Sequence, residues 1–194
     1  YLLTSELENT NEMYAIAKIA GLKMCKAYNS QFKTDFRAVM PTNLYGQNDN
    51  YDNLNSHVLA ALIKKIILAK KQNKKSFIVW GTGKPKREFL HVDDLANATV
   101  KIMNLSKKKY NKIAGEKFPF INVGSGTDIS IKDLAKLISK IVGFNGKMIF
   151  DKSKPDGTYR KLMDNKKLKK IKWKPKISLN VGIKRTISDF KATI

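Results

Sequence analysis

The chain has 194 residues, 42% of them hydrophobic, and a formal net charge of +22. This length allows one full domain or parts of two, and no apolar run approaches the roughly 18 residues that a membrane-spanning helix needs. Cys25 is the single cysteine, which excludes a disulfide framework and a cysteine zinc site and fits a reducing, cytoplasmic compartment. Without an initial methionine or a signal-peptide pattern, the sequence is expected to be part of something longer.

The charge comes almost entirely from lysine, with 34 lysines against 4 arginines. A basic chain is the first indication of nucleic-acid binding, yet contacts to phosphates and base edges usually favour the planar fork of arginine. We therefore interpret most of this charge as lysine on solvated faces and keep nucleic-acid binding as an alternative. A smaller share could serve an anionic ligand such as a diphosphate.

The first predicted element is a helix from Asn11 to about Asn29. Tyr14 and Lys18 are four residues apart within it and so lie on one face. A neighbouring ammonium favours the phenolate form of a tyrosine, which suits the hydroxyl to acid and base catalysis. The YxxxK pattern also occurs in ordinary packed helices, so a packing role stays open. The packed surface is expected to comprise Ile16, Ala17, Ile19, Ala20, Leu22, Met24 and Ala27.

A short strand is predicted over residues 36–40, followed by a loop over residues 41–46. Ligands of open parallel α/β sheets lie beyond the carboxyl ends of the strands, so this loop is either a cofactor contact or an ordinary strand ending. After a polar loop, a helix is predicted over residues 58–71. His57 stands at its N-terminus, as a structural residue or a catalyst.

The rest of the chain continues to alternate strand and helix signals. Strands are expected over residues 76–80, 86–92, 120–123 and 147–150, with turns at residues 81–83, 124–126 and 153–157. Asp93 is expected to cap a helix over residues 94–106, and a capping box from Ser130 to Asp133 predicts a helix to Val142. Residues 107–117 are expected to form a charged surface loop, and the final residues a short helix pair covering a sheet edge. This alternation predicts an α/β fold.

Six separated motifs resemble the GDP-L-fucose synthase family of extended short-chain dehydrogenase/reductases, in matching order over nearly the whole chain. YxxxK within TNEMYAIAKIAG (residues 10–21) and REFLHVDD (87–94) mark the wider superfamily. The others are MPTNLYG (40–46), NSHV (55–58), INVG (121–124), and KPDG with RKL (154–157 and 160–162). The resemblance implies the carboxyl-terminal part of a Rossmann-type parallel sheet plus a smaller α/β substrate domain.

The resemblance implies an NADPH-dependent enzyme that epimerises GDP-4-keto-6-deoxy-D-mannose at carbons 3 and 5 and reduces its carbon-4 ketone, giving GDP-L-fucose. Tyr14 would protonate the carbon-4 oxygen, Lys18 would polarise Tyr14 and bind the nicotinamide ribose, and His57 would serve epimerisation and contact the cofactor. Further cofactor contacts are implied for Pro41, Thr42, Asn43 and Leu44. Substrate contacts are implied for Lys65, Trp80, Arg87, Lys147 and Lys161, and no metal is implied.

The resemblance also places residues 1–50 at the end of an NADP-binding domain and residues 51–194 mainly in a substrate domain, with residues 86–108 packing back on the first. The glycine-rich phosphate loop, the catalytic serine and a partner cysteine are expected before Tyr1, so the chain alone is expected to be inactive. A cytoplasmic homodimer that binds a GDP-sugar, and neither membrane nor nucleic acid, is implied. The alternatives are another NAD(P)-dependent nucleotide-sugar epimerase or dehydratase and a basic nucleic-acid-binding protein.

Overall fold

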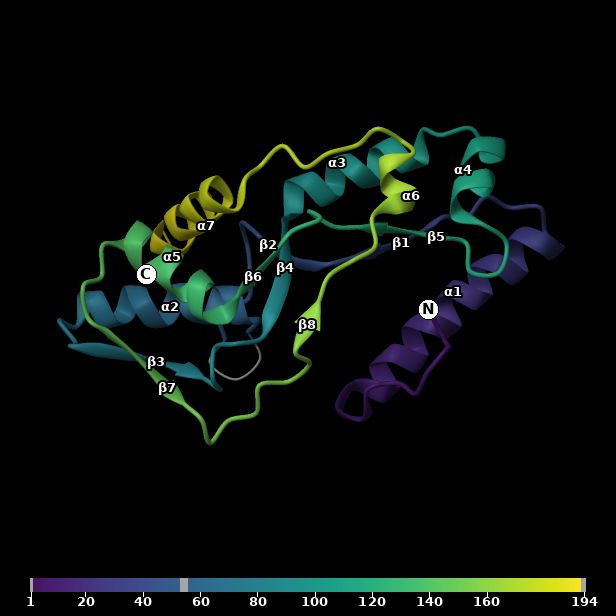
Figure 1. Cartoon of the computed structure of the whole chain (residues 1–194). Coiled ribbons are helices and arrows are strands. Elements are labelled where there is room, and N and C mark those ends of the chain that lie inside the picture. The colour runs from purple at the N-terminus through teal and green to yellow at the C-terminus, as the bar shows by residue number, and fades with distance from the viewer. Residues whose placement is uncertain (1, 53–55, 193–194) are drawn as a thin grey trace. The chain divides into compact units, whose positions relative to one another are not determined.

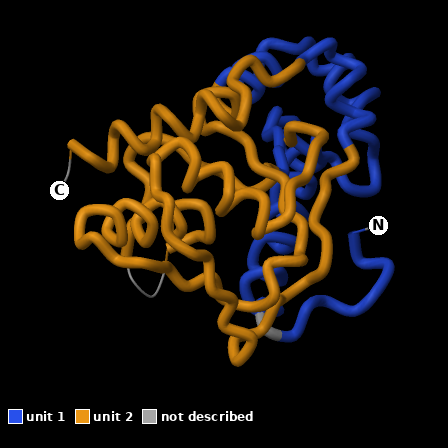
Figure 2. The backbone as a smooth tube through the Cα atoms, turned by 60° about the vertical axis from the view of Figure 1, so that its left-hand side comes forward, with its two compact units in different colours: residues 1–40, 97–123, 165–173 blue, residues 41–96, 124–164, 174–194 orange. Residues whose placement is uncertain are grey.

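The computed structural model describes residues 2–52 and 56–192, so Asn55 of the NSHV motif lies outside the described residues. The chain divides into two compact units, each assembled from three separate stretches (Figure 2). Unit 1 comprises residues 1–40, 97–123 and 165–173, and unit 2 comprises residues 41–96, 124–164 and 174–194. Each unit therefore depends on segments that are far apart in the sequence.

Unit 1 begins with the turn η1 (Asn9–Asn11) and helix α1 (Glu12–Gln31). Its other elements are strand β1 (Ala38–Pro41), the later part of α3 (Val92–Met103), α4 (Lys107–Ala114), strand β5 (Phe120–Val123) and α6 (Lys166–Lys169) (Figure 1). Strands β1 and β5 pair. The Tyr110 hydroxyl accepts the Ala38 N–H at 3.0 Å and donates to the Pro119 carbonyl at 3.0 Å, which ties α4 to β1 and to the residue before β5.

Unit 2 contains two strand groups. In the larger one, β4 (Lys86–His91) pairs in parallel with β2 (Asn43–Tyr45) and β8 (Arg160–Lys161), and antiparallel with β6 (Asp128–Ser130). In the smaller one, β3 (Ser76–Trp80) pairs in parallel with β7 (Lys147–Asp151). The helices are α2 (Val58–Lys71), α5 (Ile131–Val142) and α7 (Leu179–Ala192).

The core of unit 2 lies between these helices and the inner face of the β3–β7 pair. Ile63 and Ile66 of α2, Leu134 of α5 and Ile183 of α7 are fully buried. Phe77 and Val79 face them from β3, while Ile78 and Trp80 on the alternate positions are exposed. The period-2 alternation of a strand thus leaves Trp80 on the open face.

Most of the predicted elements are confirmed. Helices occur where they were expected at α1, α2 and α5, and strands at β3, β5 and β7. The predicted capping box is present, since the Ser130 hydroxyl accepts the Asp133 N–H at 3.0 Å. Helix α3 begins at Val92, not after Asp93, because the His91 imidazole accepts the Asp93 N–H at 3.3 Å and so satisfies one orphan donor of the first turn.

The predicted charged loop over residues 107–117 is wrong, because its first part is helix α4. The Ser106 hydroxyl caps this helix by accepting the Lys109 N–H at 3.3 Å. Tyr110, Ile113 and Ala114 form its buried face at helical spacing. The run of lysines obscured both signals. The expected pair of closing helices is also wrong, since α6 belongs to unit 1 and α7 to unit 2.

Two further expectations need correction. Pro41 ends β1, but extended backbone resumes at Asn43 because β2 pairs with residues Phe89 to His91 of β4, so residues 41–46 are not simply a loop. The apolar face of α1 was expected to be packed, yet Leu22 is its buried residue and Ile16 and Met24 are exposed. An apolar pattern identifies the face that favours burial, but it does not supply a partner.

Candidate active site

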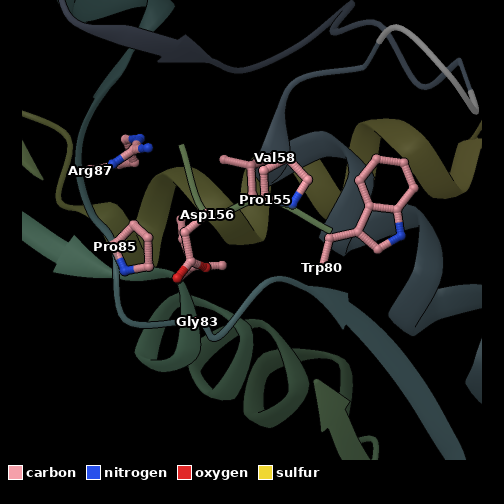
Figure 3. Close-up of a pocket in the computed structure, with 8 residues that line it drawn as sticks. Val58, Trp80, Gly83, Pro85, Arg87, Pro155 and Asp156 are labelled. Carbon is pink, nitrogen blue, oxygen red and sulfur yellow. The ribbon is translucent and has the colours of Figure 1, made fainter. Parts of the chain in front are cut away.

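A pocket of about 180 Å³ opens in unit 2 at the carboxyl end of β3 and the start of β4 (Figure 3). Trp80 supplies an indole that is 53% exposed, and Arg87 supplies a half-buried guanidinium. Val58 and Ile131 bring the N-terminal ends of α2 and α5 to the same pocket. The remaining lining residues are Gly83, Pro85, Pro155 and Asp156.

The turn after β3 fixes one wall of the pocket. Gly81 and Gly83 have φ of +75° and +74°, a region that glycine adopts without strain. Asp156 accepts the Thr82 N–H at 2.7 Å and the Thr82 hydroxyl at 2.6 Å. These bonds hold the pKa of Asp156 below its usual range. A Cβ on Gly81 would collide with the Asp156 carboxylate, so glycine is required where the KPDG segment lies against the turn.

Three cations lie around the indole and the guanidinium. Lys161 of β8 pairs with Arg87 of β4 in the strand register. The Lys65 ammonium lies 4.5 Å from the centroid of the Trp80 ring, and that of Lys154 lies 5.7 Å from it. Both interactions are of cation–π type.

Burial affects the titration of two of these groups. It lowers the pKa of Lys65, and the Asp151 carboxylate partly opposes the shift. It also lowers the pKa of Arg87, where the opposing carboxylate is Asp156. An open aromatic face beside a guanidinium and lysines can stack a planar base and bind a diphosphate.

Lys147 does not belong to this group. It begins β7 opposite Ser76, whereas Trp80 at the other end of β3 is opposite Asp151. The pair Ser76 and Lys147 is four residues along the strand from the pair Trp80 and Asp151, a separation of about 13 Å. Strand register therefore places Lys147 away from the pocket that holds Trp80 and Arg87, and the substrate contact implied for Lys147 stays a prediction.

The Tyr14–Lys18 pair lies on α1 in unit 1. The Lys18 ammonium is 5.2 Å from the centroid of the Tyr14 ring, as the i, i+4 spacing predicted. The Tyr14 side chain is 61% exposed and Lys18 is exposed as well, so hydroxyl and ammonium are both accessible to a ligand.

His57 is the exposed N-cap residue of α2, directly before Val58 of the pocket wall. Its imidazole makes no capping hydrogen bond within residues 2–52 and 56–192.

Residues 41–44 turn their polar side chains toward β4. The Thr42 hydroxyl donates to the Glu88 carbonyl at 3.2 Å, and the Asn43 amide donates to the same carbonyl at 2.8 Å. Both side chains are half-buried, and their donors are used within unit 2. The Thr42 and Asn43 donors are already used by the Glu88 carbonyl. A cofactor at this segment would therefore contact the backbone groups and the Pro41 and Leu44 side chains.

Two residues that organise the pocket were missed in the sequence. Glu88 is fully buried in β4, and Asp156 joins the KPDG segment to Thr82. Glu88 directly precedes Phe89 and Leu90, and a charged residue within a buried strand segment is a signal for a buried polar anchor. Asp156 carried no such signal, because an aspartate before glycine is common in turns.

Among the described residues, no three His, Cys, Asp or Glu side chains gather in a way that could hold a metal ion. No helix in the described part of the chain is both long and apolar enough to cross a membrane.

Residues 1–115 match the NAD dependent epimerase/dehydratase family. Over 185 residues the chain is 54% identical to a protein of Arabidopsis thaliana named putative GDP-L-fucose synthase 2, covering 95% of this chain and 54% of that protein. Over 189 residues it is 49% identical to the GDP-L-fucose synthase of Escherichia coli strain K12, covering 97% of this chain and 59% of that protein. The chain thus spans little more than half the length of either relative.

Solved structures show the same fold. The crystal structure of a GDP-6-OMe-4-keto-L-xylo-heptose reductase from C. jejuni has a TM-score of 0.89 and 36% sequence identity, covering 99% of this chain and 64% of that one. The predicted fold class is confirmed as a mixed α/β, Rossmann-like fold with parallel strand pairs.

Proposed function

The chain belongs to the NAD dependent epimerase/dehydratase family, and we propose that it forms the carboxyl-terminal part of a GDP-L-fucose synthase. The proposed enzyme epimerises GDP-4-keto-6-deoxy-D-mannose at carbons 3 and 5 and reduces its carbon-4 ketone to give GDP-L-fucose. Relatives of that name at 49–54% identity support this reaction. The observation that carries the proposal is the pocket of unit 2, which is lined by the exposed indole of Trp80 and by Arg87, whose strand partner is Lys161.

In this proposal the pocket binds the nucleotide part of the substrate. Trp80 offers a face for the guanine base, since stacking on an aromatic ring suits any planar base. Arg87 binds the diphosphate, because a guanidinium pairs with two oxygens at once. Lys161 adds a second cation next to Arg87, and Lys65 a third beside Trp80.

The chemical steps are assigned to three side chains, those of His57, Tyr14 and Lys18. His57 removes and returns protons at the carbons next to the ketone, which is general acid and base chemistry that an imidazole can carry out. Tyr14 protonates the carbon-4 oxygen, and the adjacent Lys18 polarises the Tyr14 hydroxyl and binds the nicotinamide ribose. NADPH, when bound, supplies the hydride. Pro41, Thr42, Asn43 and Leu44 provide the surface and backbone groups that contact the cofactor.

The proposal extends to the organisation of the protein. Residues 1–50 end an NADP-binding domain and residues 51–194 belong mainly to a substrate domain, with residues 86–108 packing on the first. The grouping of residues 97–123 with residues 1–40 in unit 1 supports this assignment for the later part of that segment. The protein acts as a homodimer in the cytoplasm.

The test separates the two half-reactions in the chain completed with its upstream coding sequence. His57→Gln should block epimerisation while reduction of the unepimerised ketone survives. Tyr14→Phe should suppress reduction while solvent deuterium still enters carbons 3 and 5. Tyr28→Phe, an exposed tyrosine on the same helix, is the matched control. Mass spectrometry of products formed in deuterium oxide reads both outcomes, and a His57→Gln enzyme that made GDP-L-fucose at the parental rate would contradict the assignment.

A further inference from the structure

Glu88 lies in β4 directly after Arg87, and its side chain is 0% exposed. Its Oε1 accepts the Gly126 N–H at 2.5 Å and the Ser125 hydroxyl at 3.4 Å. Its Oε2 accepts the Met163 N–H at 2.9 Å. One carboxylate therefore joins β4 to two segments that lie much later in the chain.

The surroundings of Glu88 are shaped for a carboxylate. A Cβ on Gly124 would collide with its side-chain oxygens, so glycine at that position lets the group approach the turn. The Gly126, Ser125 and Met163 groups all donate, and a carboxylate accepts through both oxygens. Burial of a carboxylate is strongly unfavourable unless it is hydrogen-bonded, so the folded state retains these contacts.

This anchor matters most for β8. The strand has only two residues and ends at Lys161, which pairs with Arg87. So short a strand is held by few backbone hydrogen bonds, and the bond from the Met163 N–H to Glu88 holds the chain where the pairing stops. It fixes the backbone two residues after Lys161 and so limits how far Lys161 can move from Arg87.

We propose that Glu88 is a positioning residue that holds Lys161 beside Arg87, so that both cations contact the diphosphate of the GDP-sugar. The inference rests on the proposed function, because it concerns the same pocket. Successive residues of a strand point to opposite faces, so Glu88 faces away from Arg87. Glu88 acts through Lys161 without touching the substrate.

The test measures the affinity of the 194-residue chain for GDP by titration calorimetry. Glu88→Gln keeps one acceptor oxygen and places an NH₂ group against a backbone N–H, so it should weaken binding about tenfold. Gly124→Ala displaces the carboxylate without changing its charge and should weaken binding by a similar factor. Gly21→Ala is the matched control, because a Cβ there meets open space in α1, and its affinity should equal that of the wild type.

Lys161→Met distinguishes positioning from a general loss of structure. Lys161→Met alone should weaken GDP binding about tenfold. If Glu88 acts through Lys161, adding Glu88→Gln to Lys161→Met should change the affinity less than about twofold. A further tenfold loss in that background would overturn the proposal, since the effect would then bypass Lys161.

Amide hydrogen exchange tests the anchor without ligand. In Glu88→Gln the Met163 N–H should lose protection while the amides of β3 keep theirs; unchanged protection at Met163 would also overturn the proposal. If the β3 amides of Glu88→Gln also lost protection, the GDP titration and the hydrogen exchange would both be measured on Gly124→Ala instead. A wild-type chain that bound no GDP would instead contradict the proposed function, and exchange at Met163 would still decide whether Glu88 anchors the segment after Lys161.

Discussion

Arg87 is the residue whose replacement should affect nucleotide binding most directly. Its half-buried side chain lines the pocket together with Pro155 and Asp156 of the KPDG segment (Figure 3). Arg87→Met removes a charged donor that has already lost part of its water shell. GDP binding by the chain should weaken by about 1.5–3 kcal/mol, which is roughly tenfold to a hundredfold.

The matched control for Arg87 is Arg185→Met. Arg185 is an exposed arginine of α7 whose guanidinium lies 4.0 Å from the Asp93 carboxylate. The replacement makes the same change in charge, and an exposed ion pair of this kind contributes little to stability. Calorimetric affinities for GDP should separate the two variants. Equal affinities would assign Arg87 to structure instead of binding.

The Thr82–Asp156 contact predicts a pH effect at the pocket wall. Hydrogen bonds from Thr82 lower the pKa of Asp156 below its usual 3.8. A lowered pKa means that the carboxylate stabilises the contact above pH 3.8, and that this contribution is lost as pH falls through the lowered value. The Thr82 amide resonance should therefore shift with a midpoint below pH 3.8.

Thr82→Val tests the cause of that shift. It removes the hydroxyl donor but keeps the backbone N–H bond, so the Asp156 midpoint should rise toward the usual value. Thr158→Val, at an exposed threonine in the following segment, is the control and should leave the midpoint unchanged. A wild-type midpoint at or above pH 3.8 would contradict the hydrogen-bonding account.

The site residues differ in how well the sequence predicted their placement. Trp80 and Arg87 lie beside one pocket, because a strand, a glycine turn and a second strand bring residues close in sequence together. The separation of Lys147 from Trp80 could not be predicted, because it depends on the register of two strands that are far apart in sequence. Glu88 was missed for the same reason, since its partners lie 37 to 75 residues later.

At the scale of elements, two helical glycines should respond to alanine with opposite signs. A Cβ on Gly182 would collide with the ring and hydroxyl of Tyr45, so α7 lies against β2 only because this residue is glycine. Gly182→Ala should destabilise unit 2 by about 1–3 kcal/mol through overpacking. Gly21→Ala meets open space in α1 and should stabilise that helix by about 0.5–1 kcal/mol.

Chemical denaturation followed by circular dichroism measures both glycine variants, and amide exchange in α7 and α1 assigns each effect to its helix. The account of α7 packing would be contradicted by a Gly182→Ala chain as stable as the wild type. A loss of stability in Gly21→Ala would show that α1 has contacts at Gly21 beyond those described.

The elements that the sequence predicted well have strong local signals. Helix α5 has both a capping box and a regular apolar stripe, and β3 has a clear strand composition bounded by glycine. Helix α4 was missed because lysines at three successive positions made its start read as a loop, although Tyr110, Ile113 and Ala114 are spaced as a helical face. Strand β2 was missed because it has only three residues and follows a proline. Its extended backbone depends on pairing with β4.

At the scale of the whole chain, the net charge of +22 is a surface property. Glu88, His91, Asp94 and Thr186 are the buried polar residues of the described ranges 2–52 and 56–192, and no lysine is among them. The lysine surplus therefore lies where water solvates it, as the sequence interpretation expected. The cations that the account uses for binding are the few near Trp80 and Arg87.

Titration of the chain with GDP, followed by tryptophan fluorescence, tests the central claim that unit 2 binds a GDP-sugar. Trp173 is buried in unit 1, so Trp80→Phe identifies the signal of the pocket. We expect saturable one-to-one binding that survives about 0.15 M salt and that random single-stranded oligonucleotide does not displace. Absence of saturation, or displacement by oligonucleotide with the steep salt dependence of phosphate-backbone binding, would contradict it.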